Sequence, residues 1–147
     1  MPESNDAPPR ASGQCLCGAV RYEVRGPLRP VIACHCTECR RFSGGFWTAT
    51  AARREDLTIH GEENVRWYAY SDRARRGFCS TCGASLFFSA PAMPHMAIAA
   101  GTLNKPTGLK LAVHIFTAEA GDYYLLTDDL PKITDGQHGL SIPEDRV

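Results

Sequence analysis

Cysteine dominates the chemistry that this sequence can carry. Seven cysteines occur among 147 residues, in three groups. Cys15 and Cys17 form a C-x-C pair, Cys34, Cys36 and Cys39 form a C-x-C-x-x-C group, and Cys79 and Cys82 form a C-x-x-C pair. Side chains two apart on a strand share a face, and a C-x-x-C turn brings two sulfurs within reach of one ion. The clustering favours metal ligation over a set of isolated buried thiols.

The number of cysteines indicates how the ligands divide. A closed structural zinc site takes four ligands, whereas a zinc site that works on a substrate keeps three protein ligands and one open position. The most economical assignment joins the two pairs into a closed zinc site, with Cys15, Cys17, Cys79 and Cys82 as ligands. Cys34, Cys36 and Cys39 then form a second, open three-thiolate site, whose zinc we expect to be more labile. The closed site would tie the start of the domain to a turn 62 residues later, and zinc binding would add to folding free energy.

Other interpretations of the middle group remain open. Cys34 could form a redox pair with Cys36 or Cys39, or the group could share a structural metal with His35. Iron also suits thiolate-rich sites. On a strand, His35 would point away from the face that carries Cys34 and Cys36, so we expect it to support the site rather than to ligate the metal.

Several polar residues near the cysteines are candidates for supporting roles. His35 and His114 are candidate proton carriers, although a single histidine on a strand is more often structural. Arg40 and Arg41 follow Cys39 directly and could bind a substrate carboxylate, or they could form a solvated pair. The basic run Arg73–Arg76 (RARR) is expected to be a solvated hairpin rather than a nucleic-acid contact.

Short strands are the elements that must position these residues. Apolar residues recur every second position in 19–24, and short β-rich runs occupy 31–34, 46–50, 65–70, 77–79, 85–88, 96–100 and 109–116. Helix is expected only as one turn near 37–42. Glycine and proline, 13 and 10 in number, separate these runs. The sequence therefore predicts a mainly β, zinc-stabilised single domain of short antiparallel strands.

The ends of the chain and its net charge predict the domain bounds, the partners and the location of the protein. Residues 1–12 are predicted to be a disordered leader, 13–136 the zinc domain, and 137–147 a loosely ordered tail. Lysine plus arginine and aspartate plus glutamate both number 16, so we expect no nucleic-acid partner. We find no membrane span and no secretory signal, and therefore expect a cytoplasmic protein with reduced cysteines. An exposed strand edge could pair two chains into a homo-oligomer.

Three segments resemble a known family. They are 13–22 (GQCLCGAVRY), 34–41 (CHCTECRR) followed by Ser43-Gly44, and 76–86 (RGFCSTCGASL). In this order they resemble the glutathione-dependent formaldehyde-activating enzymes, whose relatives include centromere protein V. Further similarity lies at 101–103, 114–115 and 128–131.

The resemblance implies a fold, a metal arrangement and an activity. The fold would be of the β-tent type. The two cysteine pairs would hold a structural zinc and the middle group a catalytic zinc, which agrees with the division by number. The family's named activity adds the glutathione thiol to formaldehyde, as a carbon–sulfur lyase.

Our leading hypothesis is therefore a zinc-dependent lyase that adds or releases a small aldehyde on a thiol such as glutathione. The thiol would bind at the three-cysteine zinc, lose its proton there and attack the aldehyde carbon. The alternatives are a non-catalytic zinc-stabilised binding module and a thiol-redox protein.

Overall fold

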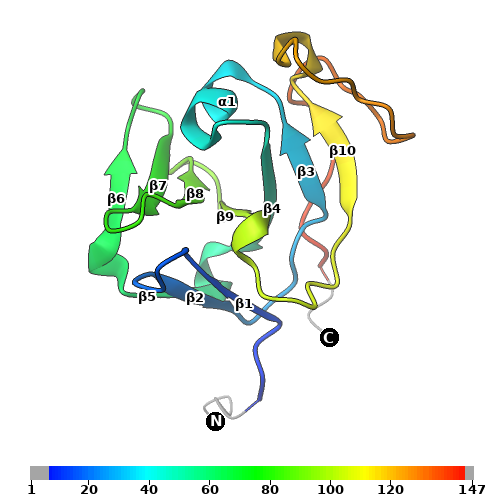
Figure 1. Cartoon of the computed structure of the whole chain (residues 1–147). Coiled ribbons are helices and arrows are strands. Elements are labelled where there is room, and N and C mark those ends of the chain that lie inside the picture. The colour runs from blue at the N-terminus through cyan, green and yellow to red at the C-terminus, as the bar shows by residue number, and fades with distance from the viewer. Residues whose placement is uncertain (1–6, 145–147) are drawn as a thin grey trace.

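The computed structural model describes residues 7–144. A three-stranded antiparallel sheet has the order β1-β2-β5, and a seven-stranded sheet has the order β10-β3-β4-β9-β8-β7-β6. The smaller sheet lies below the larger one in Figure 1. The mainly β single-domain fold expected from the sequence is confirmed.

The strands of the smaller sheet are β1 (Ala11–Gln14), β2 (Arg21–Val24) and β5 (Leu57–His60). Those of the larger sheet are β3 (Val31–Cys34), β4 (Trp47–Arg53), β6 (Val65–Tyr68), β7 (Arg75–Cys79), β8 (Ser85–Ser89), β9 (His95–Ala99) and β10 (Leu111–Ile115). The helix α1 (Thr37–Ser43) is joined by four short 3-10 turns: Arg54–Asp56, Glu62–Asn64, Ala100–Thr102 and Thr117–Glu119.

Most of the strands follow from their composition, but two do not. Strand β1 contains Ser12, Gly13 and Gln14, and β5 alternates between half-buried and exposed residues, so neither carries a strong apolar signal. Because β1 begins at Ala11, the last two residues of the expected leader belong to the fold. Residues 1–6 lie outside the described part of the chain.

One strand pair departs from the expected antiparallel arrangement. Strand β10 pairs with β3 in parallel, with Ile115 opposite Cys34. A parallel neighbour requires a long crossover connection, and here the chain passes through six other strands between β3 and β10. The pairing places β10 beside the strand that ends at the middle cysteine group.

Two apolar clusters occupy the interior. One contains Val20, Tyr22 and Val24 with Leu86, Phe87 and Ile98, among others, and joins the two sheets. The other lies on the opposite face of the larger sheet and contains Ile32, Trp47 and Val113 together with the middle cysteine group. Cys15 and Cys79 belong to the first cluster, so each cysteine group lies in a different part of the core.

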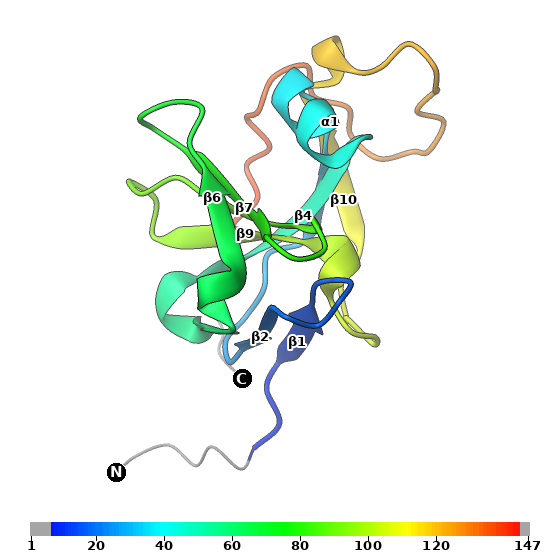
Figure 2. The ribbon, with the colours of Figure 1, turned by 60° about the vertical axis from the view of Figure 1, so that its left-hand side comes forward.

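The C-terminal segment packs against this second cluster. Residues 137–144 contain no helix or strand, yet Leu140 packs against the cluster and the Pro143 carbonyl accepts a hydrogen bond from Arg53. Figure 2 shows the segment running along the larger sheet. Residues 145–147 of the expected tail lie outside the described residues. Within 7–144, no helix is long and apolar enough to span a membrane.

Candidate metal and active site

Two separate groups of thiols are brought together by the fold. Cys15, Cys17, Cys79 and Cys82 form one group, and Cys34, Cys36 and Cys39 form the other. Within each group the sulfur atoms all lie within 4.8 Å of one another. The division into four and three is the one that the sequence predicts.

The four-thiol group has the dimensions of a zinc site. The Sγ atom of Cys17 lies 3.7 Å from that of Cys15 and 3.8 Å from that of Cys79. Four sulfurs arranged tetrahedrally at about 2.3 Å from a zinc ion are about 3.8 Å apart. A disulfide would require about 2.05 Å. The residues therefore fit a zinc ion held by four thiolates.

Backbone N–H groups prepare this site for negative charge. Val20 donates to the Cys15 sulfur over 3.3 Å, and Thr81 and Cys82 donate to the Cys79 sulfur over 3.4 and 3.5 Å. Hydrogen bonds with the backbone at Cys17 and Ala84 lower the pKa of the Cys82 thiol to about 6. Gly83 follows with a φ of 77°, the left-handed conformation expected after a C-x-x-C turn. Such bonds favour the thiolate over the thiol.

The three-thiol group lies where β3 meets α1. Cys34 is the last residue of β3, Cys36 is the N-cap of α1, and Cys39 lies in the first turn of the helix. The Cys36 sulfur accepts a hydrogen bond from the backbone N–H of Cys39 over 3.3 Å. All three side chains are buried, with 4–7% of their surface exposed. The helix cap thus places two of the three sulfurs.

The three thiols influence one another strongly. Hydrogen bonds from Cys34 and Cys39, with the positive charge of Arg76, lower the pKa of the Cys36 thiol. The same interaction with Cys36 raises the pKa of the Cys34 thiol. Like charges so close cannot all form without a compensating cation. Three thiolates here therefore suit a divalent metal ion, and zinc accepts such ligands.

Arg76 is a charged neighbour of the three-thiol group. Its burial differs from what the sequence predicts. Its side chain is only 4% exposed, whereas Arg73 and Arg75 are exposed, so the solvated-hairpin interpretation is wrong for Arg76. Its Nη2 atom lies 3.5 Å from the Cys39 sulfur. Its Nε and Nη1 atoms are buried without a hydrogen-bond partner among the described residues.

Aromatic rings enclose this guanidinium. The rings of Phe88, Phe42, Trp47 and Tyr70 have their centroids 4.9–5.9 Å from the Arg76 Cζ atom. The indole Nε1 of Trp47 is also buried without a hydrogen-bond partner in the described chain. The Arg76 guanidinium and the Trp47 indole are thus two donor groups without acceptors near the three-thiol group. They indicate a place for an electron-rich ligand.

His35 lies at the centre of a hydrogen-bonded chain. Its Nδ1 lies 2.6 Å from the Tyr124 hydroxyl, and its Nε2 lies 2.9 Å from Nδ1 of His114. The Nε2 of His114 lies 2.8 Å from Oδ2 of Asp128. His35 is fully buried and His114 is 3% exposed. These hydrogen bonds connect the loop between Cys34 and Cys36 to β10 and to the segment that follows β10.

The direction of each bond follows from the carboxylate. Asp128 can only accept, so His114 donates from Nε2. In the neutral form of His114, Nδ1 then accepts the N–H of His35. The free Nδ1 of His35 then accepts the Tyr124 hydroxyl. Hydrogen bonding to His114 lowers the pKa of Asp128 to about 2, and burial lowers the pKa of His35. Both effects maintain a charged Asp128 and a neutral His35.

The structure separates the two arginines that follow Cys39. Arg40 donates from Nε to the Glu119 carbonyl over 3.0 Å, whereas the Arg41 side chain is exposed. The Glu119 carboxylate accepts hydrogen bonds from the backbone N–H and the hydroxyl of Thr37. The segment around Glu119 is thereby attached to α1.

Sequence reasoning missed Arg76, Tyr124 and Asp128 as neighbours of the site. Alternation along β7 was the available signal for Arg76, since Arg76 and Phe78 share the strand face opposite to that of Arg75. Tyr124 and Asp128 lie in a segment without regular structure, so no periodicity could place them.

A small, mainly β domain with one four-thiol and one three-thiol site defines the class of protein. Residues 10–119 match the family of the glutathione-dependent formaldehyde-activating enzymes. The chain belongs to this family.

Individual proteins show the same relationship. A Halomonas elongata protein, provisionally named a glutathione-dependent formaldehyde-activating enzyme, is 33% identical over 92 residues, which cover 57% of this chain and 59% of that protein. An uncharacterized lyase of Schizosaccharomyces pombe is 32% identical over 81 residues, covering 55% of this chain and 58% of that protein. The aligned part spans less than two thirds of each of these relatives.

A solved structure shares the fold. A Rhodobacter sphaeroides protein of known crystal structure superposes with a TM-score of 0.54 and 26% sequence identity. The match covers 82% of this chain and 98% of that protein.

Proposed function

We propose that this chain is a zinc-dependent carbon–sulfur lyase-type enzyme that adds or releases a small, formaldehyde-like aldehyde on a thiol such as glutathione. The observation that carries the proposal is the buried group of Cys34, Cys36 and Cys39, which offers three thiol ligands and no fourth among the described residues. The four-thiol group would hold the structural zinc. The activity after which the family and the Halomonas elongata relative are named supports thiol and aldehyde chemistry of this kind.

The residues around the three-thiol group would have different roles. When bound to three thiolates, zinc supplies an open coordination position and lowers the pKa of a thiol placed there. Cys34, Cys36 and Cys39 would hold the ion, and Arg76 would balance their negative charge. Trp47, which is buried, and the partly buried Phe42 and Phe88 would limit the access of water to one side of the site.

We infer a positioning role for His35 rather than direct proton transfer. Both of its ring nitrogens already have partners in Tyr124 and His114, so the ring would fix the backbone between Cys34 and Cys36. Arg40 and Arg41 remain proposed contacts for a substrate carboxylate. Arg41 offers the freer guanidinium, because Arg40 is bonded to the Glu119 carbonyl.

The alternatives receive less support from the site. Redox-sensing cysteines are usually accessible to solvent, whereas the three thiols here are buried. A nucleic-acid-binding module would be expected to carry a basic excess, and the formal net charge of this chain is zero.

Cys36→Ser is the most direct test. Serine is a good N-cap residue, so its hydroxyl can replace the sulfur as acceptor for the Cys39 N–H and preserve α1. Formaldehyde consumption in the presence of glutathione would be followed by NMR for wild type and variant, each compared with a reaction without thiol. We expect the variant to lose activity while one zinc per chain remains. Full activity in the variant would contradict the proposal.

A further inference from the structure

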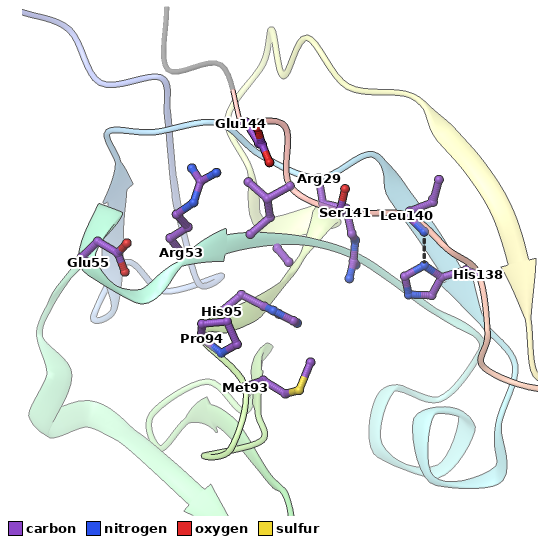
Figure 3. A pocket seen from close by; sticks show the side chains of 12 residues that line it. Arg29, Arg53, Glu55, Met93, Pro94, His95, His138, Leu140, Ser141 and Glu144 are labelled. Carbon is purple, nitrogen blue, oxygen red and sulfur yellow. Dashed lines mark hydrogen bonds between the residues drawn. The ribbon is translucent and has the colours of Figure 1, made fainter.

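A cavity lies on the larger sheet, and none of the seven cysteines lines it. It measures about 600 Å³ and is bounded by β4, β9 and the segment 138–144. Figure 3 shows Arg53 and His95 on the sheet side and His138, Leu140 and Ser141 on the C-terminal side. Arg53 pairs with His95 at one end of β4, whereas Trp47 pairs with Cys34 at the other. Six residues of strand, about 20 Å, separate Arg53 from Trp47. Arg29 lies between them and donates a hydrogen bond to the Ala49 carbonyl.

Arg29 places a buried positive charge at the wall of this cavity. Its side chain is 6% exposed, and it donates from Nη2 to the Ala49 carbonyl over 3.1 Å and from Nε to the Pro30 carbonyl over 3.3 Å. Both partners are neutral, and within residues 7–144 no carboxylate forms an ion pair with Arg29. A buried charge without an opposite charge is costly. An anion in the cavity would remove that cost.

Two imidazoles face the same space and are suited to donate hydrogen bonds. Nδ1 of His138 accepts the Leu140 N–H over 2.9 Å, so the neutral ring carries its proton on Nε2. Burial, and then the charge of Arg29, lower the pKa of both His138 and His95. The rings are therefore neutral donors beside a cation.

The acidic residues that line the cavity form no ion pair with Arg29 among the described residues. Glu55 and Glu144 also line the cavity, and in Figure 3 Glu55 lies at the opposite end from His138. At the Glu55 end, Arg53 faces Asp56 with 3.8 Å between Nη1 and Oδ2. Arg29 therefore supplies the positive charge beside the neutral His138.

Apart from Ser141, the rest of the wall is apolar. Ala51, Met93, Pro94, Leu140 and Ile142 contribute to it. A cavity of this volume is in the range of small-molecule sites and exceeds what a bare inorganic anion fills. We propose that the cavity binds a small organic carboxylate, with the carboxylate at Arg29 and His138 and the apolar chain against Met93, Leu140 and Ile142.

Hexanoate is a suitable probe, with hexanol as its neutral counterpart and inorganic phosphate as a bare anion. The Cε1–Hε1 NMR signals of His95 and His138 would be followed during titration of the full chain loaded with zinc. We expect saturable shifts with hexanoate and much smaller ones with hexanol and phosphate. The absence of saturable shifts would overturn the proposal, as would equal responses to hexanol or to phosphate.

Variants test the assigned contacts. Arg29→Met should weaken hexanoate binding by about tenfold or more, because it removes a charged donor. This variant also removes two hydrogen bonds to the backbone and can fail to fold, so His138→Ala provides the second test, with about three- to tenfold weaker binding expected. His60→Ala, at an exposed position on β5, is the matched control and should bind as wild type. Wild-type affinity in His138→Ala would contradict the proposal.

Discussion

The Nη2 atom of Arg76 lies 3.5 Å from the Sγ atom of Cys39, although the two residues are 37 positions apart in the sequence. The contact joins β7 to α1 and places a cation beside three thiols. Strand β7 also ends at Cys79, a member of the four-thiol group. One strand therefore connects the two candidate zinc sites, with Arg76 facing one and Cys79 belonging to the other.

Arg76 should control how firmly the three-thiol site retains its metal. Groups that hydrogen-bond to metal ligands typically contribute 10- to 100-fold to metal affinity. We expect Arg76→Met to weaken zinc binding at the three-thiol site by about tenfold or more, measured by competition with a chromogenic chelator. Arg75→Met is the control, since Arg75 is exposed and stacks on Trp67 instead. Equal retention in both variants would contradict a role for Arg76 at the site.

The four-thiol site should be required for folding to a greater extent than the three-thiol site. Cys79 is fully buried in the cluster that joins the sheets, and its group connects residues 62 positions apart. Because zinc binding free energy adds to folding free energy, Cys79→Ser should lose cooperative thermal unfolding seen by circular dichroism. Cys36→Ser should keep it. A Cys79→Ser protein that melts like wild type would show that this site is not structural.

Tyr124 should stabilise the loop that carries Cys34 and Cys36. Tyr124→Phe removes only the hydroxyl, which leaves the Nδ1 atom of buried His35 without a partner and also removes the hydrogen bond from the Gly121 N–H. The unpaired Nδ1 costs about 1–3 kcal/mol. Urea denaturation would measure the loss. Tyr123→Phe is the matched control, because Tyr123 is adjacent in sequence and 68% exposed. If the two variants lose equal stability, the hydrogen bond between Tyr124 and His35 does not stabilise the fold.

Stability should depend on pH through His95. Burial, followed by the charges of Arg29 and Arg54, lowers the pKa of His95 below the ordinary value of 6.5. The unfolded chain therefore binds this proton more readily than the folded chain. The contribution of His95 is fully present above pH 6.5 and is lost as the pH falls through the folded-state pKa.

Comparison of wild type with His95→Gln isolates the contribution of His95 to the pH dependence of stability. Release of zinc in acid affects wild type and variant alike. We expect the urea midpoint of wild type to fall more steeply than that of His95→Gln below pH 6.5, in a buffer free of carboxylates. Parallel pH profiles would contradict the shift in the pKa of His95.

Short-range patterns account for the parts of the site that were predictable. Each short cysteine motif brings its own sulfurs together. The joining of Cys15 and Cys17 with Cys79 and Cys82 was predicted from the number of cysteines, because a closed zinc site takes four ligands. Strand β3 was predicted with its observed bounds because Val31–Cys34 is continuously apolar. The supporting role of His35 stays a prediction, and its premise was wrong, because His35 lies between β3 and α1 rather than on a strand.

Long-range contacts account for what was missed. The burial of Arg76 depends on the rings of Phe42, Trp47 and Phe88, which come from three other elements. The parallel pairing of β10 with β3 depends on a crossover that periodicity does not reveal. Strand β1 escaped prediction because its four residues, Ala11–Gln14, include a glycine and two polar residues. In each case, partners distant in sequence determine the environment.

We propose that the chain has two distinct thiolate metal sites, one closed and one open. Elemental mass spectrometry of zinc per chain, on reduced and freshly purified wild type and Cys36→Ser, tests it most directly. We predict about two zinc ions per wild-type chain and about one per Cys36→Ser chain, from four-ligand and three-ligand sites. About one zinc ion in both proteins would contradict the account, because the three-thiol group would then not be a metal site.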